Sequence, residues 1–228
     1  MTIESHPPLE EYLETMWYLI EDGIEVIPTR LAERLGRSLP TVTQRLDRLV
    51  AEGYLLRPLG KQLEFTQQGQ KLAEGVVRKH RLAECLLYQI IGLSYVKLHI
   101  EAGRWEHAIS DEVEHLIMTL LANPLRCPHG NPIPYGTAAD AAITSSGIRL
   151  NEAEVGVPLR LQRITEELEE DEALMTTLVD NQIFPGGELC ITHKDSQALT
   201  VHHQGHFVTL ETKSAALLVV DPFTGGPQ

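Results

Sequence analysis

The segment TRLAERLGRSLPTVTQRL, residues 29–46, decides the fold of the N-terminal part of the chain. Apolar residues recur in it at helical spacing on both sides of a turn that contains Gly36. Thr29 is expected to cap a short helix, which Gly36 ends. Ser38 is expected to open a second helix with Pro40 in its first turn. Two helices around such a turn, the second one basic and amphipathic, are typical of a helix-turn-helix.

The residues on either side of this segment fit the same domain. Residues 9–21 carry apolar side chains at helical spacing and predict a helix before it. Residues 54–66 hold two short strand-like runs around Gly60-Lys61, which predict a hairpin after it. We therefore expect a winged helix-turn-helix domain over residues 1–74.

Charge is distributed unevenly along the chain. The formal net charge is −13, but residues 26–61 hold seven basic residues and only three acidic ones. Affinity for DNA depends on local basic patches and not on the charge of the whole chain. The overall acidity therefore does not exclude DNA binding.

Exposed polar and basic side chains of this domain are the candidates for DNA contact. Hydroxyls and amides at a helix N-terminus suit phosphates, Gln44 can read an adenine edge, and Pro40 or Thr41 can meet a thymine methyl group. The alternative is a three-helix core whose polar face is only solvated, but the capping, the wing and the basic bias favour DNA. The predicted DNA-binding residues are Arg30, Ser38, Pro40, Thr41, Thr43, Gln44, Arg45, Arg57 and Lys61.

Beyond the hairpin the pattern is first helical and then changes to short strands. Thr66 is expected to cap a long helix that ends near residue 91, and further helices are predicted over residues 94–103 and 105–121. We assign residues 75–140 to a helical domain. Residues 127–156 are rich in Pro, Gly, Ala and Ser, and we assign the last part of this stretch, residues 141–156, to a linker.

The last part of the chain, residues 157–228, predicts a small β-barrel. A helix over residues 172–180 interrupts its β-like runs, and turns such as Pro185-Gly186-Gly187 separate them. The expected fold class is therefore mainly α with small β. The predicted strands are residues 159–164, 188–192, 198–202, 206–210 and 216–220.

Composition and cysteine content narrow the class of protein. The chain is 43% hydrophobic and 22% charged, which is ordinary for a soluble globular protein. No apolar run approaches the roughly 20 residues that cross a bilayer, and the first residues lack a signal-peptide pattern. Cys85, Cys127 and Cys190 are too few for a disulfide framework. The sequence predicts a cytoplasmic protein without membrane contact.

Side chains that can bind a metal recur at helical spacings. His80 and Glu84 lie four residues apart and face the same way, as do Glu11 and Glu14 on the first helix. Taken singly, each residue is ordinary, because a lone histidine is more often structural than a ligand. Two such faces brought together would form one or two sites of imidazole and carboxylate. A further helix face carries His99, Gly103, Glu106 and His107, and a loop carries the compact but weak Cys127/His129 pair.

Several of these stretches resemble the diphtheria toxin repressor family, which includes iron-dependent regulators and manganese transport regulators. The resemblance covers at least residues 9–134, and order, spacing and context all agree. It implies a winged helix-turn-helix, a helical metal-binding and dimerisation domain, and a C-terminal small β-barrel like that of FeoA. The matching stretches are LAERL at 31–35, RKHRLAE at 78–84, IIGL at 90–93, EAGRWEHAISDEVE at 101–114 and GNPIP at 130–134.

The resemblance also implies metal ligands on the helices. His80, Glu84 and His99 match the ligands of one family site. Glu106 and His107 match ligands of the other site, the activating one.

Further ligands are implied at the first helix and in the C-terminal half. Glu11 falls where the first helix supplies a ligand in the family, and Glu14 matches a further carboxylate of the manganese branch. Cys127 and His129 match a secondary-site pair of manganese-type members. An acidic residue near Asp171 or Glu172 is expected to complete that site from the barrel.

Gly103 departs from the family pattern, which has cysteine here in the iron branch and glutamate in the manganese branch. One side-chain ligand is therefore missing, and the Gly103 carbonyl or a water is expected to replace it. Carboxylate and imidazole ligands without sulfur suit manganese. Mn(II) is therefore favoured over Fe(II), while Zn(II), Co(II) or Ni(II) are expected to bind in vitro without being the cellular signal.

The resemblance implies a metal-dependent repressor of metal-uptake genes that binds a palindromic double-stranded DNA operator as a homodimer. An Fe(II)-activated regulator of the same architecture is the nearest alternative. A metalloenzyme and an adaptor that binds a protein partner through its barrel are alternatives of other classes. The sequence contains no HExxH-type motif, so we expect no enzyme.

Overall fold

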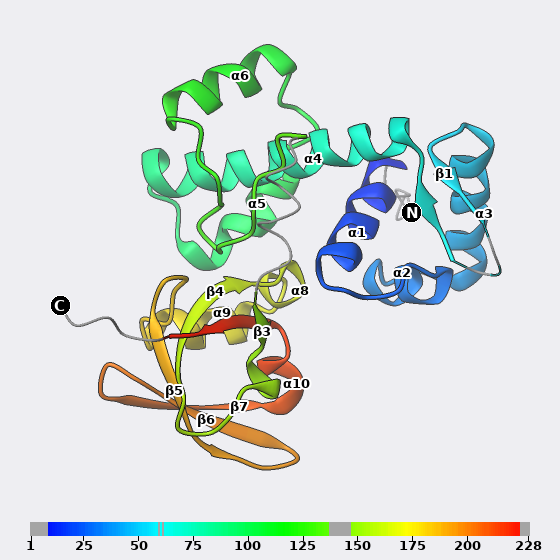
Figure 1. Cartoon of the computed structure of the whole chain (residues 1–228). Helices are drawn as coiled ribbons and strands as arrows, with labels where there is room; N and C mark the ends of the chain where they lie inside the picture. Colours follow the sequence, from blue (N-terminus) through cyan, green and yellow to red (C-terminus); the bar gives the residue numbers. More distant parts are fainter. Residues whose placement is uncertain (1–8, 59, 61, 137–146, 224–228) are drawn as a thin grey trace, which may run out of the picture. The chain divides into compact units, whose positions relative to one another are not determined.

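The computed structural model describes residues 9–58, 60, 62–136 and 147–223 (Figure 1). The described chain divides into two compact units, and the division falls inside one helix, between Lys79 and His80. The first unit runs up to Lys79 and also includes the residues from Pro134 onward to the gap at 137–146. The second unit contains His80 to Ile133 and the residues after that gap.

The first unit consists of three helices, a two-stranded hairpin and the beginning of a long helix. Leu55 of the hairpin lies opposite Phe65 in an antiparallel pair. The predicted winged helix-turn-helix is thus present. Its elements are α1 (Leu9–Glu21), α2 (Pro28–Arg34), α3 (Leu39–Ala51), β1 (Leu55–Leu56), β2 (Glu64–Phe65) and the first turns of α4 (Gln67–Leu86).

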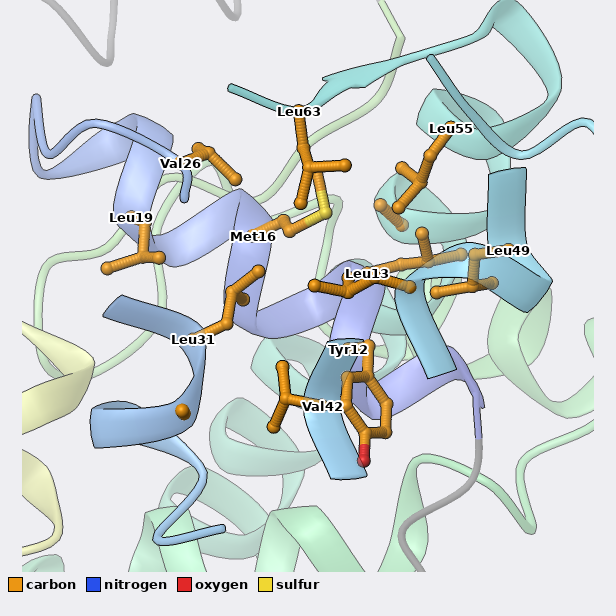
Figure 2. Packing of buried hydrophobic residues seen from close by; sticks show 13 residues of the cluster. Tyr12, Leu13, Met16, Leu19, Val26, Leu31, Val42, Leu49, Leu55 and Leu63 are labelled. Atoms are coloured by element: carbon orange, nitrogen blue, oxygen red, sulfur yellow. The ribbon is translucent and has the colours of Figure 1, made fainter. Parts of the chain in front are cut away.

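Apolar side chains from all these elements meet in one core, which Figure 2 shows from close by. The ten core residues labelled in Figure 2 are each at most 5% exposed, and full burial of one such side chain stabilises the fold by about 1.5–3 kcal/mol. The core residues labelled in Figure 2 are Tyr12, Leu13, Met16, Leu19, Val26, Leu31, Val42, Leu49, Leu55 and Leu63.

The helix ends of this unit follow the predicted caps at two of three places. Ser38 precedes α3, and its hydroxyl accepts a hydrogen bond from Thr41 N. Thr66 precedes α4 and accepts from Gly69 N at 3.0 Å. The predicted cap at Thr29 is wrong, because α2 already begins at Pro28. Proline has no N–H to satisfy and its fixed φ suits the first helical position, so α2 begins without a side-chain cap.

The second unit begins with the last turns of α4 and continues through short helices. A π-helical turn η1 (Leu87–Ile91) and a 3₁₀ turn η2 (Tyr95–Lys97) lead into α5 (Leu98–Trp105). The predicted single helix over residues 105–121 is wrong at its start, since the chain turns after α5 and α6 covers Asp111–Leu120. Ser110 causes this new start, because its side chain caps α6 by accepting from Val113 N.

A six-stranded antiparallel sheet follows in the same unit, with strand order β3-β8-β4-β5-β6-β7 (Figure 1). All five predicted strands and the helix over 172–180 are present, and closure of the sheet into a barrel stays a prediction. The strands are β3 (Ile148–Arg149), β4 (Pro158–Ile164), β5 (Glu188–Lys194), β6 (Ala198–His203), β7 (His206–Glu211) and β8 (Leu218–Pro222). The helices are η3 (Leu150–Glu152), α8 (Glu166–Glu169), α9 (Glu172–Asp180) and α10 (Thr212–Ala215).

The loop after α6 is joined to β4 by backbone and side-chain hydrogen bonds. Ile164 N donates to His129 O at 2.8 Å, and Asn131 Nδ2 donates to Ile164 O at 2.8 Å. A Cβ atom on Gly130 would overlap the carbonyl oxygen of Gln162, so this close approach requires glycine. The loop that carries the Cys127/His129 pair is therefore fixed against the sheet. None of the described helices is long and apolar enough to cross a bilayer.

Candidate metal centre

Four segments of the second unit bring seven potential metal ligands together, here called the seven-residue cluster. Two lie one turn apart on α4, one lies on α5, two lie in the loop after α6, and two lie three residues apart on α8. All are buried except His99, whose side chain is 15% exposed. The seven residues are His80, Glu84, His99, Cys127, His129, Glu166 and Glu169.

One part of this cluster consists of nitrogen and oxygen donors. Nε2 of His80 lies 3.1 Å from Nδ1 of His99 and 3.7 Å from Oε1 of Glu84. Oε2 of Glu166 lies 3.1 Å from the same nitrogen of His99. The ligand atoms of these four residues lie within 4.8 Å of one another. Ligands held about 2.1 Å from one ion are themselves roughly 3–4 Å apart, so this spacing suits one metal ion.

The other part adds sulfur. Cys127, His129 and Glu84 again offer ligand atoms within 4.8 Å of one another. Nδ1 of His129 lies 3.0 Å from Oε1 of Glu84 and 2.9 Å from Oε2 of Glu169. The structure thus brings the predicted Cys-x-His pair to the same carboxylate that serves the first part.

The cluster contains buried polar atoms that make no hydrogen bond to any residue that the structure describes. They are Oε2 of Glu84 and Nε2 of His129, whereas Oε2 of Glu166 and Oε2 of Glu169 contact the imidazole nitrogens of His99 and His129. A buried polar atom without a partner costs about 1–3 kcal/mol, so two in one cluster require an explanation. A divalent cation would provide partners for carboxylate and imidazole donors, and the cluster therefore fits a metal ion.

The two carboxylates of α8 are each held at one oxygen and directed into the cluster with the other. Oε1 of Glu166 accepts from Arg81 Nε at 3.0 Å and from its Nη2 at 2.9 Å. Oε1 of Glu169 accepts from Asn131 Nδ2 at 2.7 Å. Such outer partners orient the ligands of metal sites.

Without a metal, the histidines of the cluster hold protons. Burial by itself lowers the pKa of His99, but the hydrogen bonds that Glu166 and Glu169 accept from it raise this pKa to about 10. The pKa of His129 is also well above its usual range, because the charges of Glu169 and Glu84 outweigh the effect of burial. Burial and the nearby carboxylates raise the pKa of the Cys127 thiol. Metal binding must therefore displace protons from these groups.

A second group of predicted ligands surrounds Glu106, directly after α5. Oε2 of Glu106 lies 2.6 Å from Nδ1 of His80, and its Oε1 lies 3.1 Å from Nε2 of His107. Gly103 lies on α5, and a Cβ atom there would meet nothing within 4 Å. The missing side-chain ligand thus leaves open space at this position.

The remaining predicted ligands are not part of the seven-residue cluster. Glu11 and Glu14 are on α1 in the first unit, where Glu14 accepts from Tyr18 Oη at 2.6 Å, and their part in a metal site stays a prediction. The structure does not place Asp171 in the cluster: it is exposed, and its side chain caps α9 by accepting from Leu174 N at 3.0 Å. Glu166 and Glu169 take that place, and the acidic run at residues 166–172 was the signal for them.

The predicted DNA-binding residues lie in the first unit. Ser38 directly before α3 is exposed, as are Pro40 and Gln44 on α3, and Thr41 and Thr43 are half-buried. Arg57 reaches back from the hairpin to Asp47 on α3, at 2.9 Å between Nη2 and Oδ1. The other basic candidates are Arg30, which pairs with Glu33, Arg45, which is half-buried, and Lys61, which lies outside the described residues.

These features define a class of protein: a winged helix-turn-helix followed by helices and a sheet that enclose a candidate metal centre. Comparisons with known proteins agree. Residues 6–57 match the model of the iron dependent repressor N-terminal DNA binding domain, and residues 66–135 match that of the iron dependent repressor metal binding and dimerisation domain. The chain belongs to this family of iron-dependent repressors, which includes the diphtheria toxin repressor.

Individual relatives cover nearly the whole chain. The iron-dependent repressor IdeR of Mycobacterium tuberculosis (strain H37Rv) is 38% identical over 221 residues, 93% of this chain and 96% of the relative. The diphtheria toxin repressor of Corynebacterium diphtheriae is 40% identical over 208 residues, 88% and 91% of the two chains. A solved manganese-dependent transcriptional repressor in complex with manganese has a TM-score of 0.82, 25% identity, and coverage of 95% and 100%.

The family assignment settles the general function. The chain is a metal-dependent transcriptional repressor that binds DNA and forms homodimers, and it is not an enzyme. Exposed apolar side chains in the helical part of the second unit fit a dimer interface. They are Tyr88, Ile90, Ile91, Ile100, Leu116 and Leu120.

Proposed function

We propose that the chain represses metal-uptake genes when Mn(II) is abundant, by binding a palindromic operator as a homodimer. The observation that carries this proposal is the seven-residue cluster of buried carboxylate, imidazole and thiol donors, in which Oε2 of Glu84 and Nε2 of His129 make no hydrogen bond to a described residue. A repressor acts on the chromosome, so a cytoplasmic location is part of the proposal.

The ligands are assigned to two groups. His80, Glu84 and His99, completed by Glu166, form one site, which the short distances between their donor atoms support. Glu106 and His107 belong to the activating site, to which Glu11 and Glu14 contribute from α1. The Cys127/His129 pair belongs to the cluster, with Glu169 in the place expected for Asp171.

Mn(II) is proposed as the activator because the activating residues offer only carboxylate and imidazole donors. The second candidate is Fe(II), which is favoured by the names of the relatives: those 38–40% identical include proteins named iron-dependent repressor. Solved structures of similar fold include complexes with manganese and with zinc.

The chain's own residues account for the coupling between metal and DNA. A bound divalent cation supplies the positive charge that buried carboxylates otherwise obtain from protonated histidines. His80, His99 and His129 give up their protons on binding, so affinity for the metal rises with pH. A metal that binds the DNA-competent state more tightly raises DNA affinity by the same factor as DNA raises metal affinity.

Recognition of DNA is assigned to α3 and the hairpin. α3 enters the major groove, where Gln44 reads a base edge and the hydroxyls of Ser38 and Thr41 contact phosphates. Arg57 of the hairpin, which pairs with Asp47 of α3, is assigned to contacts with the DNA phosphates.

The test is an anaerobic titration of Mn(II) or Fe(II) into the apo protein, with binding to a labelled palindromic promoter fragment followed by fluorescence anisotropy. We expect binding to appear with Mn(II) and to vanish with chelator. Activation by Fe(II) alone would agree with a metal-dependent repressor but would contradict the choice of Mn(II) as its activator. Equal DNA binding with chelator and with either metal would contradict the proposal that metal controls DNA binding.

A further inference from the structure

The two parts of the seven-residue cluster are not separate, because two carboxylates lie between them. Oε1 of Glu84 lies 3.7 Å from Nε2 of His80 and 3.0 Å from Nδ1 of His129. Oε2 of Glu169 lies 3.4 Å from Nδ1 of His99 and 2.9 Å from the same nitrogen of His129. Each carboxylate thus contacts one imidazole of each part.

The cluster also holds more donors than one ion uses. Seven side chains converge, whereas a structural or catalytic zinc takes about four ligands and a larger cation about six. Bridging carboxylates are typical of two-metal sites, in which the ions lie about 3.5–4 Å apart. Glu84 has a second oxygen, Oε2, that makes no hydrogen bond to a described residue, and Glu169 directs Oε2 at imidazole nitrogens of both parts, so each carboxylate is placed to bind two ions.

We propose that the seven residues form one dinuclear metal centre, in which Glu84 and Glu169 bridge two divalent cations. His80, His99 and Glu166 complete the first position, and Cys127 and His129 complete the second. This inference rests on the proposed function, because it specifies the metal centre of the same repressor.

The two positions differ in chemical character. The first offers only imidazole and carboxylate, whereas the second adds a thiolate from Cys127. Soft thiolate favours metals such as Zn(II), Co(II) or Fe(II) over Mn(II). The second position therefore fills first with Co(II) or Zn(II), and Mn(II) prefers the first position.

The experiment counts Co(II) ions bound per protomer of the full-length apo protein by native mass spectrometry, and follows the thiolate-to-Co(II) charge-transfer band by absorption. Cys127→Ser should lose one ion and the band. His99→Ala should lose one ion and keep the band. Glu84→Gln and Glu169→Gln should each weaken both positions by at least tenfold, as a lost or altered ligand typically does. Cys190→Ser is the matched control, since this cysteine lies on β5 outside the cluster.

A second signal tests the bridge itself. Two Mn(II) ions joined by carboxylates are magnetically coupled, so the electron paramagnetic resonance spectrum of the loaded protein should show a hyperfine spacing half that of a single ion. The coupled spectrum should disappear in Cys127→Ser and persist in Cys190→Ser. Circular dichroism of each apo variant confirms that it is folded.

Two outcomes would overturn the dinuclear centre: ion counts in Cys127→Ser and His99→Ala that equal the wild-type count, or a coupled spectrum that survives Cys127→Ser. Neither outcome would contradict the proposed repressor function, because the anisotropy titration measures metal-dependent DNA binding independently. Conversely, DNA binding that does not depend on metal would contradict the proposed function. The ion count would still test the dinuclear centre.

Discussion

His80 offers its two ring nitrogens to different partners. Its Nδ1 lies 2.6 Å from Oε2 of Glu106, while its Nε2 lies 3.1 Å from Nδ1 of His99. A histidine that binds metal through one nitrogen is usually held at the other by a carboxylate, which fixes the orientation of the ring. Glu106 is therefore a positioning residue for His80 as well as a candidate ligand of the activating site.

Gly103 offers no side-chain ligand to the predicted activating site, so a substitution at this position can add one. Because a side chain at Gly103 would meet nothing within 4 Å of its Cβ, Gly103→Cys adds a thiol without displacing a neighbour. We expect Gly103→Cys to bind Co(II) and Fe(II) about tenfold or more tightly, as measured by competition with a chelator of known affinity.

Gly103→Ala is the control for this substitution. It adds a methyl group but no ligand, so it should leave the metal affinity unchanged and stabilise α5 by up to about 1 kcal/mol. Equal metal affinities for Gly103→Cys and Gly103→Ala would mean that position 103 does not face a metal.

The raised pKa of His99 predicts that the stability of the apo protein depends on pH. Its pKa is raised from 6.5 to about 10 by Glu166 and Glu169 despite burial, so the charged form is favoured in the folded state. The stabilisation is fully present below pH 6.5 and is lost as the pH rises through about 10. In chelator, the difference in Tm between wild type and His99→Gln should be larger at pH 6 than at pH 10. A difference that is the same at both pH values would contradict this assignment.

At the scale of elements, the loop after α6 depends on its contact with β4. Gly130 has φ +87°, and a Cβ there would also lie 2.9 Å from Cα of Arg163. Gly130→Ala should therefore displace the loop that carries Cys127 and His129. We expect a loss of about 1–3 kcal/mol in the free energy of unfolding, together with weaker metal binding.

A matched control separates backbone strain from the close contact. Gly205, in the turn between β6 and β7, has φ +85°, but a Cβ there meets nothing within 4 Å. Gly205→Ala should lower the free energy of unfolding only by the backbone strain, and it should leave metal binding unchanged. Denaturant unfolding and Co(II) titration of both variants make the comparison, and equal effects of the two would argue against a special role for the contact at Gly130.

At the scale of the whole molecule, metal binding should appear as stability. The cluster draws its ligands from α4, α5, the loop and α8, so a cation joins the helical and sheet parts of the second unit. A metal at a hundred times its Kd adds about 2.7 kcal/mol to the free energy of unfolding. The Tm should rise on adding Mn(II) and fall back with chelator, and His99→Ala should reduce the rise. A Tm that is insensitive to metal in the wild type would exclude the cluster as a metal centre.

Local signals in the sequence determined most of the architecture. Helical periodicity, the caps at Ser38 and Thr66, and alternating strands each depend on residues close together in the chain, so the winged helix-turn-helix and five strands of the sheet could be predicted. The prediction that His80, Glu84 and His99 are ligands came from the resemblance to a family.

Tertiary structure alone decided which acidic residues complete the cluster. The run at residues 166–172 holds six acids, and α8 is a single turn, too short for periodicity to show which of them face inward. Glu166 is selected by Arg81, 85 residues away in the chain, and Glu169 by Asn131. Contacts of that separation leave no local pattern, which is why Asp171 was predicted where Glu169 lies. The sharing of Glu84 between two groups of ligands is likewise visible only once the chain has folded.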